Sequence, residues 1–140
     1  MCVQIAGACD ETGILVPLVN LRKLRGKETI VHKKSLTALM RHQLEAARSA
    51  SSGRSAVTVF GGHEHVMRQT MISLLAGRHL SEHENPGEAT IQVLQGRVCL
   101  TAGENSWNGS PGDLLIVPDS RHALEAVEDS IVLLTVAKQR

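Results

Sequence analysis

The chain has 140 residues, of which 42% are hydrophobic and 21% are charged, so it can form one domain with a substantial core but is too short for two. Its formal net charge of +1 provides no overall field that would attract nucleic acid or an anionic membrane surface. No apolar run reaches the roughly 18 to 20 residues of a membrane span, and the three cysteines form no CxxC pair, so we expect a cytoplasmic protein.

Residues 1–34 are predicted to form a basic N-terminal arm. The segment has no clear hydrophobic period and holds six of the chain's 15 basic residues, namely Arg22, Lys23, Arg25, Lys27, Lys33 and Lys34. A run of charge is most often a solvated segment. The alternatives are an arm that binds an anion and an edge strand that pairs with a partner subunit.

Residues 35–52 are predicted to form an N-terminal helix and a linker. Ser35 is a suitable N-cap, and the apolar residues Leu36, Leu39, Met40, Leu44 and Ala47 follow at a spacing that places them on one helical face. The polar run SASSGRS at 49–55 is too rich in small residues to continue the helix. We expect the helix to pack on the domain that follows.

From residue 56 to 138 the pattern changes to short β-rich runs separated by Gly, Pro and Asn. The predicted strands cover 56–60, 65–75, 89–94, 97–101, 114–117, 122–126 and 130–136. No strand is predicted between residues 76 and 88 or between 102 and 113. Short strands at this spacing are typical of an all-β antiparallel sandwich or barrel.

Two segments of this β region carry the most specific signal. The first segment is the run His83-Glu84-Asn85-Pro86-Gly87-Glu88, followed by a strand-like stretch that ends at Gly96. In the second segment, five residues separate Gly112 from Pro118, and His122 follows. The pair resembles the two signature motifs of the cupin superfamily, over a stretch from near residue 67 to residue 137. The resemblance implies a double-stranded β-helix, or jelly-roll barrel, here preceded by an α-helix.

The resemblance also implies where a ligand would bind. In metal-binding cupins the first motif supplies two histidines and a glutamate, and the second motif supplies a histidine. His83 and His122 match the first and last of these positions, whereas Asn85 and Ala89 occupy the other two. Two imidazoles alone bind a divalent metal weakly, because such ions take three or four ligands.

Two kinds of site therefore remain open. In a metal-free pocket, His83, Asn85, His122 and Gln69 would contact an organic ligand, and the imidazoles would act as hydrogen-bonding or proton-transferring groups. In a metal site, His83 and His122 would be joined by Glu88 around zinc, iron, manganese or nickel. His63 and His65 form a second, weaker candidate pair, because alternate residues of an extended segment share one face.

The functional hypothesis is that the barrel binds a small molecule without a specified activity. The alternative is a metal-dependent enzyme, an oxygenase or an isomerase, since the resemblance implies these reactions. A third possibility is an interaction protein that uses the basic arm and the helix. The resemblance also implies a homodimer, and neither nucleic acid nor a membrane is an expected partner.

Overall fold

The computed structural model describes residues 8–9, 15–16, 30–85 and 87–139, and the chain divides into two compact units, residues 1–33 and 34–140. In the first unit, β1 (Ala8–Cys9) pairs antiparallel with β2 (Leu15–Val16). Most of the predicted basic arm, including Arg22, lies outside the described residues. The second unit contains the helix and the two larger sheets.

The predicted N-terminal helix is present as α1 (Leu36–Ser49). Ser35 is its N-cap, and the Ser35 hydroxyl accepts a hydrogen bond of 3.2 Å from the Ala38 amide. The helix contacts β3 and β4, and its buried Leu44 packs with Met71 and Ile131 of the sheet. The expectation that the helix packs on the β domain is confirmed.

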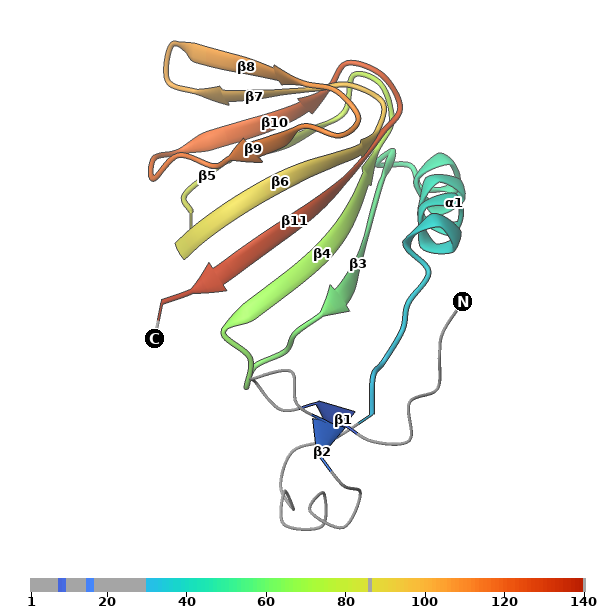
Figure 1. Ribbon diagram of the computed structural model, residues 1–140. Helices are drawn as coiled ribbons and strands as arrows, with labels where there is room; N and C mark the ends of the chain where they lie inside the picture. The colour runs from blue at the N-terminus through green and yellow to red at the C-terminus, as the bar shows by residue number, and fades with distance from the viewer. Residues whose placement is uncertain (1–7, 10–14, 17–29, 86, 140) are drawn as a thin grey trace. The chain divides into compact units, whose positions relative to one another are not determined.

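The rest of the unit consists of antiparallel strands in two sheets (Figure 1). One sheet has the order β5-β10-β7-β8 and the other β3-β4-β11-β6-β9. All seven predicted strands are present, and the jelly-roll architecture is confirmed. The strands are β3 (Arg54–Phe60), β4 (Met67–Leu74), β5 (His79–His83), β6 (Gly87–Gln95), β7 (Val98–Ala102), β8 (Asn105–Gly109), β9 (Leu114–Ile116), β10 (His122–Ala126) and β11 (Ser130–Lys138).

Two strands, β5 and β8, lie where no strand was predicted. Both have mostly polar, exposed residues, and both are edge strands of the four-stranded sheet. Hydrogen bonding to β10 and β7 compensates for their low intrinsic β propensity. Their sequences carry no clear apolar alternation, because most side chains of β5 and β8 are exposed on both faces of the strand.

The main core lies between the two sheets and draws on both of them. It contains Ile72, Leu74, Ala89, Ile91, Val93, Val98, Leu100, Val117, Leu124, Ala126 and Val132. On β6 the core-facing residues are Ala89, Ile91 and Val93, so the alternate residues Glu88 and Thr90 face outward. This alternation decides which side chains of the first motif can reach the interior.

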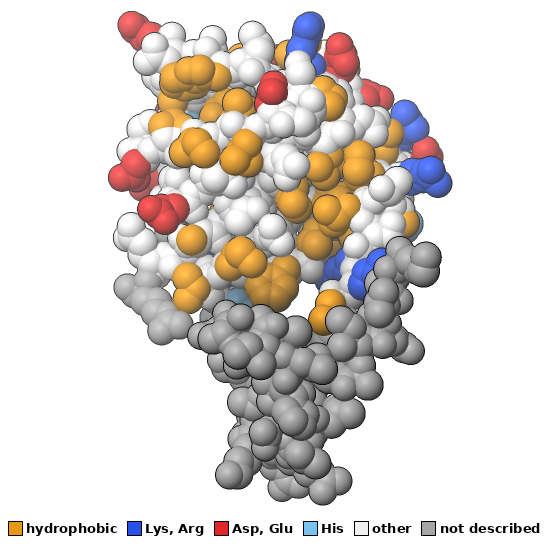
Figure 2. Space-filling model, in the orientation of Figure 1, with side chains coloured by type: hydrophobic (Ala, Val, Ile, Leu, Met, Phe, Trp, Pro, Cys, Tyr) orange, Lys and Arg blue, Asp and Glu red, His pale blue; other side chains and the backbone are white. Residues whose placement is uncertain are grey.

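Several large apolar side chains are exposed on the outer surface. In the view of Figure 2, hydrophobic side chains gather over the sheets, while most charged side chains lie at the periphery. On the edge strand β9, Leu114 is 58% and Ile116 is 70% exposed. Among the described residues, no helix is long and apolar enough to cross a membrane.

Candidate functional site

The two motif histidines lie next to each other at the ends of β5 and β10. His83 and His122 are Cα partners in the antiparallel pairing of these strands. Their rings make an edge contact, with centroids 4.5 Å apart and an interplanar angle of 61°. His122 is only 5% exposed, whereas His83 is exposed. The fold therefore brings together two imidazoles that are 39 positions apart in the sequence.

Both imidazoles are oriented in the same way by the backbone. Nδ1 of His83 lies 2.8 Å from the Ser81 carbonyl oxygen, and Nδ1 of His122 lies 2.8 Å from the Ser120 carbonyl oxygen. A carbonyl oxygen only accepts, so each Nδ1 is assigned as the N–H donor. In a neutral ring, the lone pair is then on Nε2, which is free to bind a metal or to accept a proton.

The other residues of the predicted ligand set do not converge on this pair. Asn85 is half-buried, and its Oδ1 accepts a hydrogen bond of 3.2 Å from the Gly87 amide. Ala89 faces the core, and Glu88, next to it on β6, points to the opposite side of the sheet. No group of three His, Cys, Asp or Glu side chains suited to a metal occurs among the described residues.

The second histidine pair lies in the loop between β3 and β4. His63 and His65 line a hollow of about 230 Å³ together with Glu64, Val66, Lys138 and Gln139. The Lys138 ammonium donates a hydrogen bond of 3.0 Å to the Gly62 carbonyl, and the His65 ring lies edge-on to Phe60 at 5.0 Å. Although Glu64 lines the same hollow, these side chains do not form a group that could hold a metal ion.

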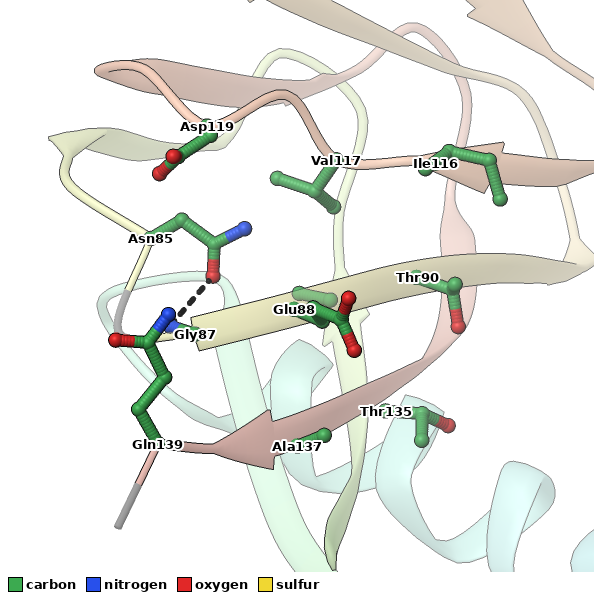
Figure 3. Close-up of a pocket in the computed structure, with 11 residues that line it drawn as sticks. Asn85, Gly87, Glu88, Thr90, Ile116, Val117, Asp119, Thr135, Ala137 and Gln139 are labelled. Atoms are coloured by element: carbon green, nitrogen blue, oxygen red, sulfur yellow. Dashed lines mark hydrogen bonds between the residues drawn. The ribbon is translucent and has the colours of Figure 1, made fainter.

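A cavity with a volume of about 580 Å³ lies beside Asn85 (Figure 3). Its walls come from the first motif, from β9 and the residues that follow it, and from the end of β11. The lining residues are Asn85, Gly87, Glu88, Ala89, Thr90, Ile116, Val117, Asp119, Thr135, Ala137 and Gln139. Neither motif histidine is among them.

The cavity lies mainly over the outer face of the five-stranded sheet. Thr135 pairs with Thr90, and Ala137 with Glu88, so these residues share the face opposite the core. Figure 3 shows Glu88 and Thr90 on β6 and Asp119 on the loop beyond β9. The core-facing residues Ala89 and Val117 reach its rim, and Ile91 and Val93 pack fully in the core instead of lining a hollow.

Gln69 has an indirect relation to the cavity. It lies on β4 and does not line the cavity, but its amide Nε2 donates a hydrogen bond of 3.2 Å to the Thr135 hydroxyl. Thr135 itself lines the cavity. Of the residues predicted for a ligand pocket, Asn85 therefore lines the cavity and Gln69 supports a lining residue.

Sequence reasoning did not identify Asp119, Thr90, Thr135 or Gln139 as cavity residues. Alternation along β6 and β11 could have shown that Thr90 and Thr135 face away from the core. No sequence signal could have placed Asp119, because its position depends on how the chain turns after Pro118. The meeting of β9, β6 and β11 brings these residues together.

The structure resembles several solved structures. A conserved protein of unknown function from Streptococcus pyogenes is 24% identical, with 81% of this chain and 94% of that chain covered and a TM-score of 0.61. An RmlC-like cupin protein from Desulfovibrio desulfuricans is 27% identical, with 76% and 97% covered and a TM-score of 0.59.

A third similar structure is the salicylate 1,2-dioxygenase from Pseudoaminobacter salicylatoxidans in complex with gentisate. It is 16% identical, with 71% of this chain and 32% of that chain covered and a TM-score of 0.61. No protein-family model and no curated protein matches the sequence. The similarity to these structures is one of fold.

Proposed function

We propose that this protein, whose fold is that of the cupin superfamily, binds a small organic molecule in the cavity beside Asn85. The observation that carries the proposal is the cavity itself, which has about 580 Å³ of space and combines apolar walls with hydroxyl, amide and carboxylate groups. Such a mixture is usual for small-molecule sites. The fold accommodates organic ligands elsewhere, since the salicylate 1,2-dioxygenase structure holds gentisate.

The charges of the cavity indicate which molecules it prefers. Among the described residues that line it, Glu88 and Asp119 are the ionisable ones, and none of these described residues is Lys or Arg. Two carboxylates attract a cation and repel an organic acid. The hydroxyls of Thr90 and Thr135 and the amide of Gln139 can orient polar groups of the ligand. We therefore expect a small organic cation that also forms hydrogen bonds.

The test is calorimetric titration of the full chain with putrescine and choline, with succinate as the anionic comparison. We expect the cations to bind and succinate not to bind. Asp119→Asn and Glu88→Gln should each weaken cation binding about fivefold, the scale of one partly exposed charge contact. Glu104→Gln, which removes a carboxylate from the exposed turn between β7 and β8, is the matched control and should change nothing.

Equal weakening by Glu104→Gln would mean that only the net charge matters and that the cavity is not the site. Preferential binding of succinate would contradict the assignment of a cationic ligand. Neither result depends on the motif histidines, because these residues do not line the cavity.

A metal-dependent activity is the second candidate, and the orientation of the motif histidines favours it. Both Nε2 lone pairs of His83 and His122 are available because each Nδ1 donates to a carbonyl, which is the usual support of a metal-ligating histidine. A bound divalent metal would supply a Lewis acid at this pair. The two imidazoles fit part of a metal site, and solvent or a substrate would have to provide the remaining ligands.

Metal analysis of tag-free protein decides this second candidate. Near one equivalent of zinc, iron, manganese or nickel that is lost in His83→Ala and kept in His42→Ala would support it. His42 is the control because it is exposed on α1, away from the pair. A protein without metal after growth with all four ions would contradict the metal-dependent enzyme and leave the cavity proposal intact.

We also propose that two copies of the chain associate through the edge strand β9. The support is the exposure of Leu114 and Ile116 on that strand, where burial against a second sheet would remove apolar surface from water. A strand added at this edge would also satisfy unpaired backbone groups. Because Ile116 also lines the ligand cavity, this interface would adjoin the cavity.

A further inference from the structure

We propose that the protein has a second binding site, for the phosphate group of a small phosphorylated molecule, in a basic hollow between the α1–β3 loop and β5. The hollow has a volume of about 230 Å³ and is lined by Ser52, Arg54, Arg78, His79 and Ser81. None of these residues lines the cavity beside Asn85, so this site is independent of the proposed function.

The charge of this hollow is uncompensated. Arg54 and Arg78 line it together, and no Asp or Glu does. Neither guanidinium lies within ion-pair distance of a carboxylate in the described part of the chain, whereas Arg48 pairs with Glu45 and Arg121 with Glu82. Two like charges in one small hollow repel each other, and an anion between them removes that repulsion.

Arg54 is held in place by the backbone, and Arg78 packs beside Gly53. Nη1 of Arg54 donates a hydrogen bond of 3.1 Å to the carbonyl oxygen of His79, which ties β3 to the start of β5. Arg78 lies against Gly53, and a Cβ built on Gly53 would come within 2.8 Å of Arg78 Nε. Gly53 has a φ of +64°, a conformation that glycine adopts without strain. The loop thus leaves room for the Arg78 side chain.

The chemistry of the lining matches a phosphate group. Guanidinium groups form paired hydrogen bonds to phosphate oxygens, and Ser52 and Ser81 can add hydroxyl donors. The His79 ring can donate an N–H as well. No apolar side chain lines the hollow, so it would hold the phosphate and leave the rest of the molecule in solvent. Glu125, the Cα partner of His79 on β10, does not line it.

The test is an NMR titration of the ¹⁵N-labelled full chain with phenyl phosphate and with inorganic phosphate, at an ionic strength held constant with sodium chloride. We expect saturable amide shifts confined to residues 52–54 and 78–81. Arg54→Gln and Arg78→Gln should each weaken phosphate binding by about fivefold or more, because each removes a charged guanidinium group that can form paired hydrogen bonds. Arg41→Gln should not, since Arg41 is exposed on α1 and outside the hollow.

Shifts spread over the whole surface, or equal weakening by Arg41→Gln, would overturn the proposal. So would binding to phosphatidate vesicles without binding to either free phosphate compound, because the ligand would then be a membrane surface. If Arg54→Gln fails to fold, Arg54→Lys keeps the charge without the paired donors and should still weaken binding. Gly53→Ala should weaken it too, by displacing Arg78.

Discussion

Ser73 offers a sensitive test of the structure, because replacing it should stabilise the protein. Its side chain on β4 is fully buried, and its hydroxyl is the one buried side-chain polar atom without a hydrogen-bond partner in the described part of the chain. Its Cα partners are Ser55 and Ile131 on the flanking strands. Burying an unpaired hydroxyl costs about 1 to 3 kcal/mol, and Ser73→Ala removes that cost while leaving only a small void.

We expect Ser73→Ala to raise the free energy of unfolding by about 1 kcal/mol, which is roughly 4 °C in Tm for a domain of this size. Ser130 is the matched control, since it is 1% exposed and pairs with Leu74, the next residue of β4. Its single hydroxyl hydrogen is shared between two carbonyl oxygens, that of Glu128 at 2.7 Å and that of Arg97 at 3.0 Å. Ser130→Ala should therefore destabilise by about 1 kcal/mol.

Urea denaturation of the full chain, followed by circular dichroism, measures both changes on the same scale. Opposite signs for the two serines are the expected result. If Ser73→Ala destabilises the protein as much as Ser130→Ala does, the Ser73 hydroxyl must be paired, and the reasoning from its burial fails.

Two further predictions concern a turn and an interface. Gly61→Ala should lower the free energy of unfolding by about 2 kcal/mol in the same assay, because Gly61 has a φ of +98° and an added Cβ would lie 2.4 Å from the Met67 carbonyl oxygen. The neighbouring Gly62→Ala is the control: no atom lies within 4 Å of its added Cβ, so the free energy of unfolding should change by no more than about 0.5 kcal/mol. Equal losses in the two variants would refute this reasoning. Leu114→Asp should convert a dimer to a monomer in light scattering coupled to size exclusion, whereas Glu104→Gln should not; a dimer that survives Leu114→Asp would exclude β9 as the interface.

The elements with a strong local pattern could be predicted from the sequence. Ser35 and the apolar stripe that follows it identified α1 within a residue or two, because a cap and a helical period depend only on neighbouring residues. The β-rich runs at 89–94 and 130–136 likewise located β6 and β11 within two residues at each end. The motif residues His83, Gly112, Pro118 and His122 predicted the jelly-roll fold, which the structure confirms.

The candidate site was predictable only in part. Asn85 was among the residues expected in a pocket, and it lines the cavity. Alternation along β6 indicates the side that Glu88 faces, but the participation of Asp119 and Thr135 depends on how β6 pairs with β9 and β11. The basic hollow likewise joins Arg54 of β3 to Arg78 and His79, which lie more than 20 positions away in the chain.

By itself, the sequence determined the elements whose apolar residues repeat at a helical or a strand period, because each such element must bury one face. Only the tertiary structure decided that the polar segments β5 and β8 become strands, since their hydrogen-bonding partners, β10 and β7, come from elsewhere in the chain. It also decided that the imidazoles of His83 and His122 meet while the cavity forms on the other side of β6. Strand pairing between distant segments sets both outcomes, and local sequence patterns do not specify it.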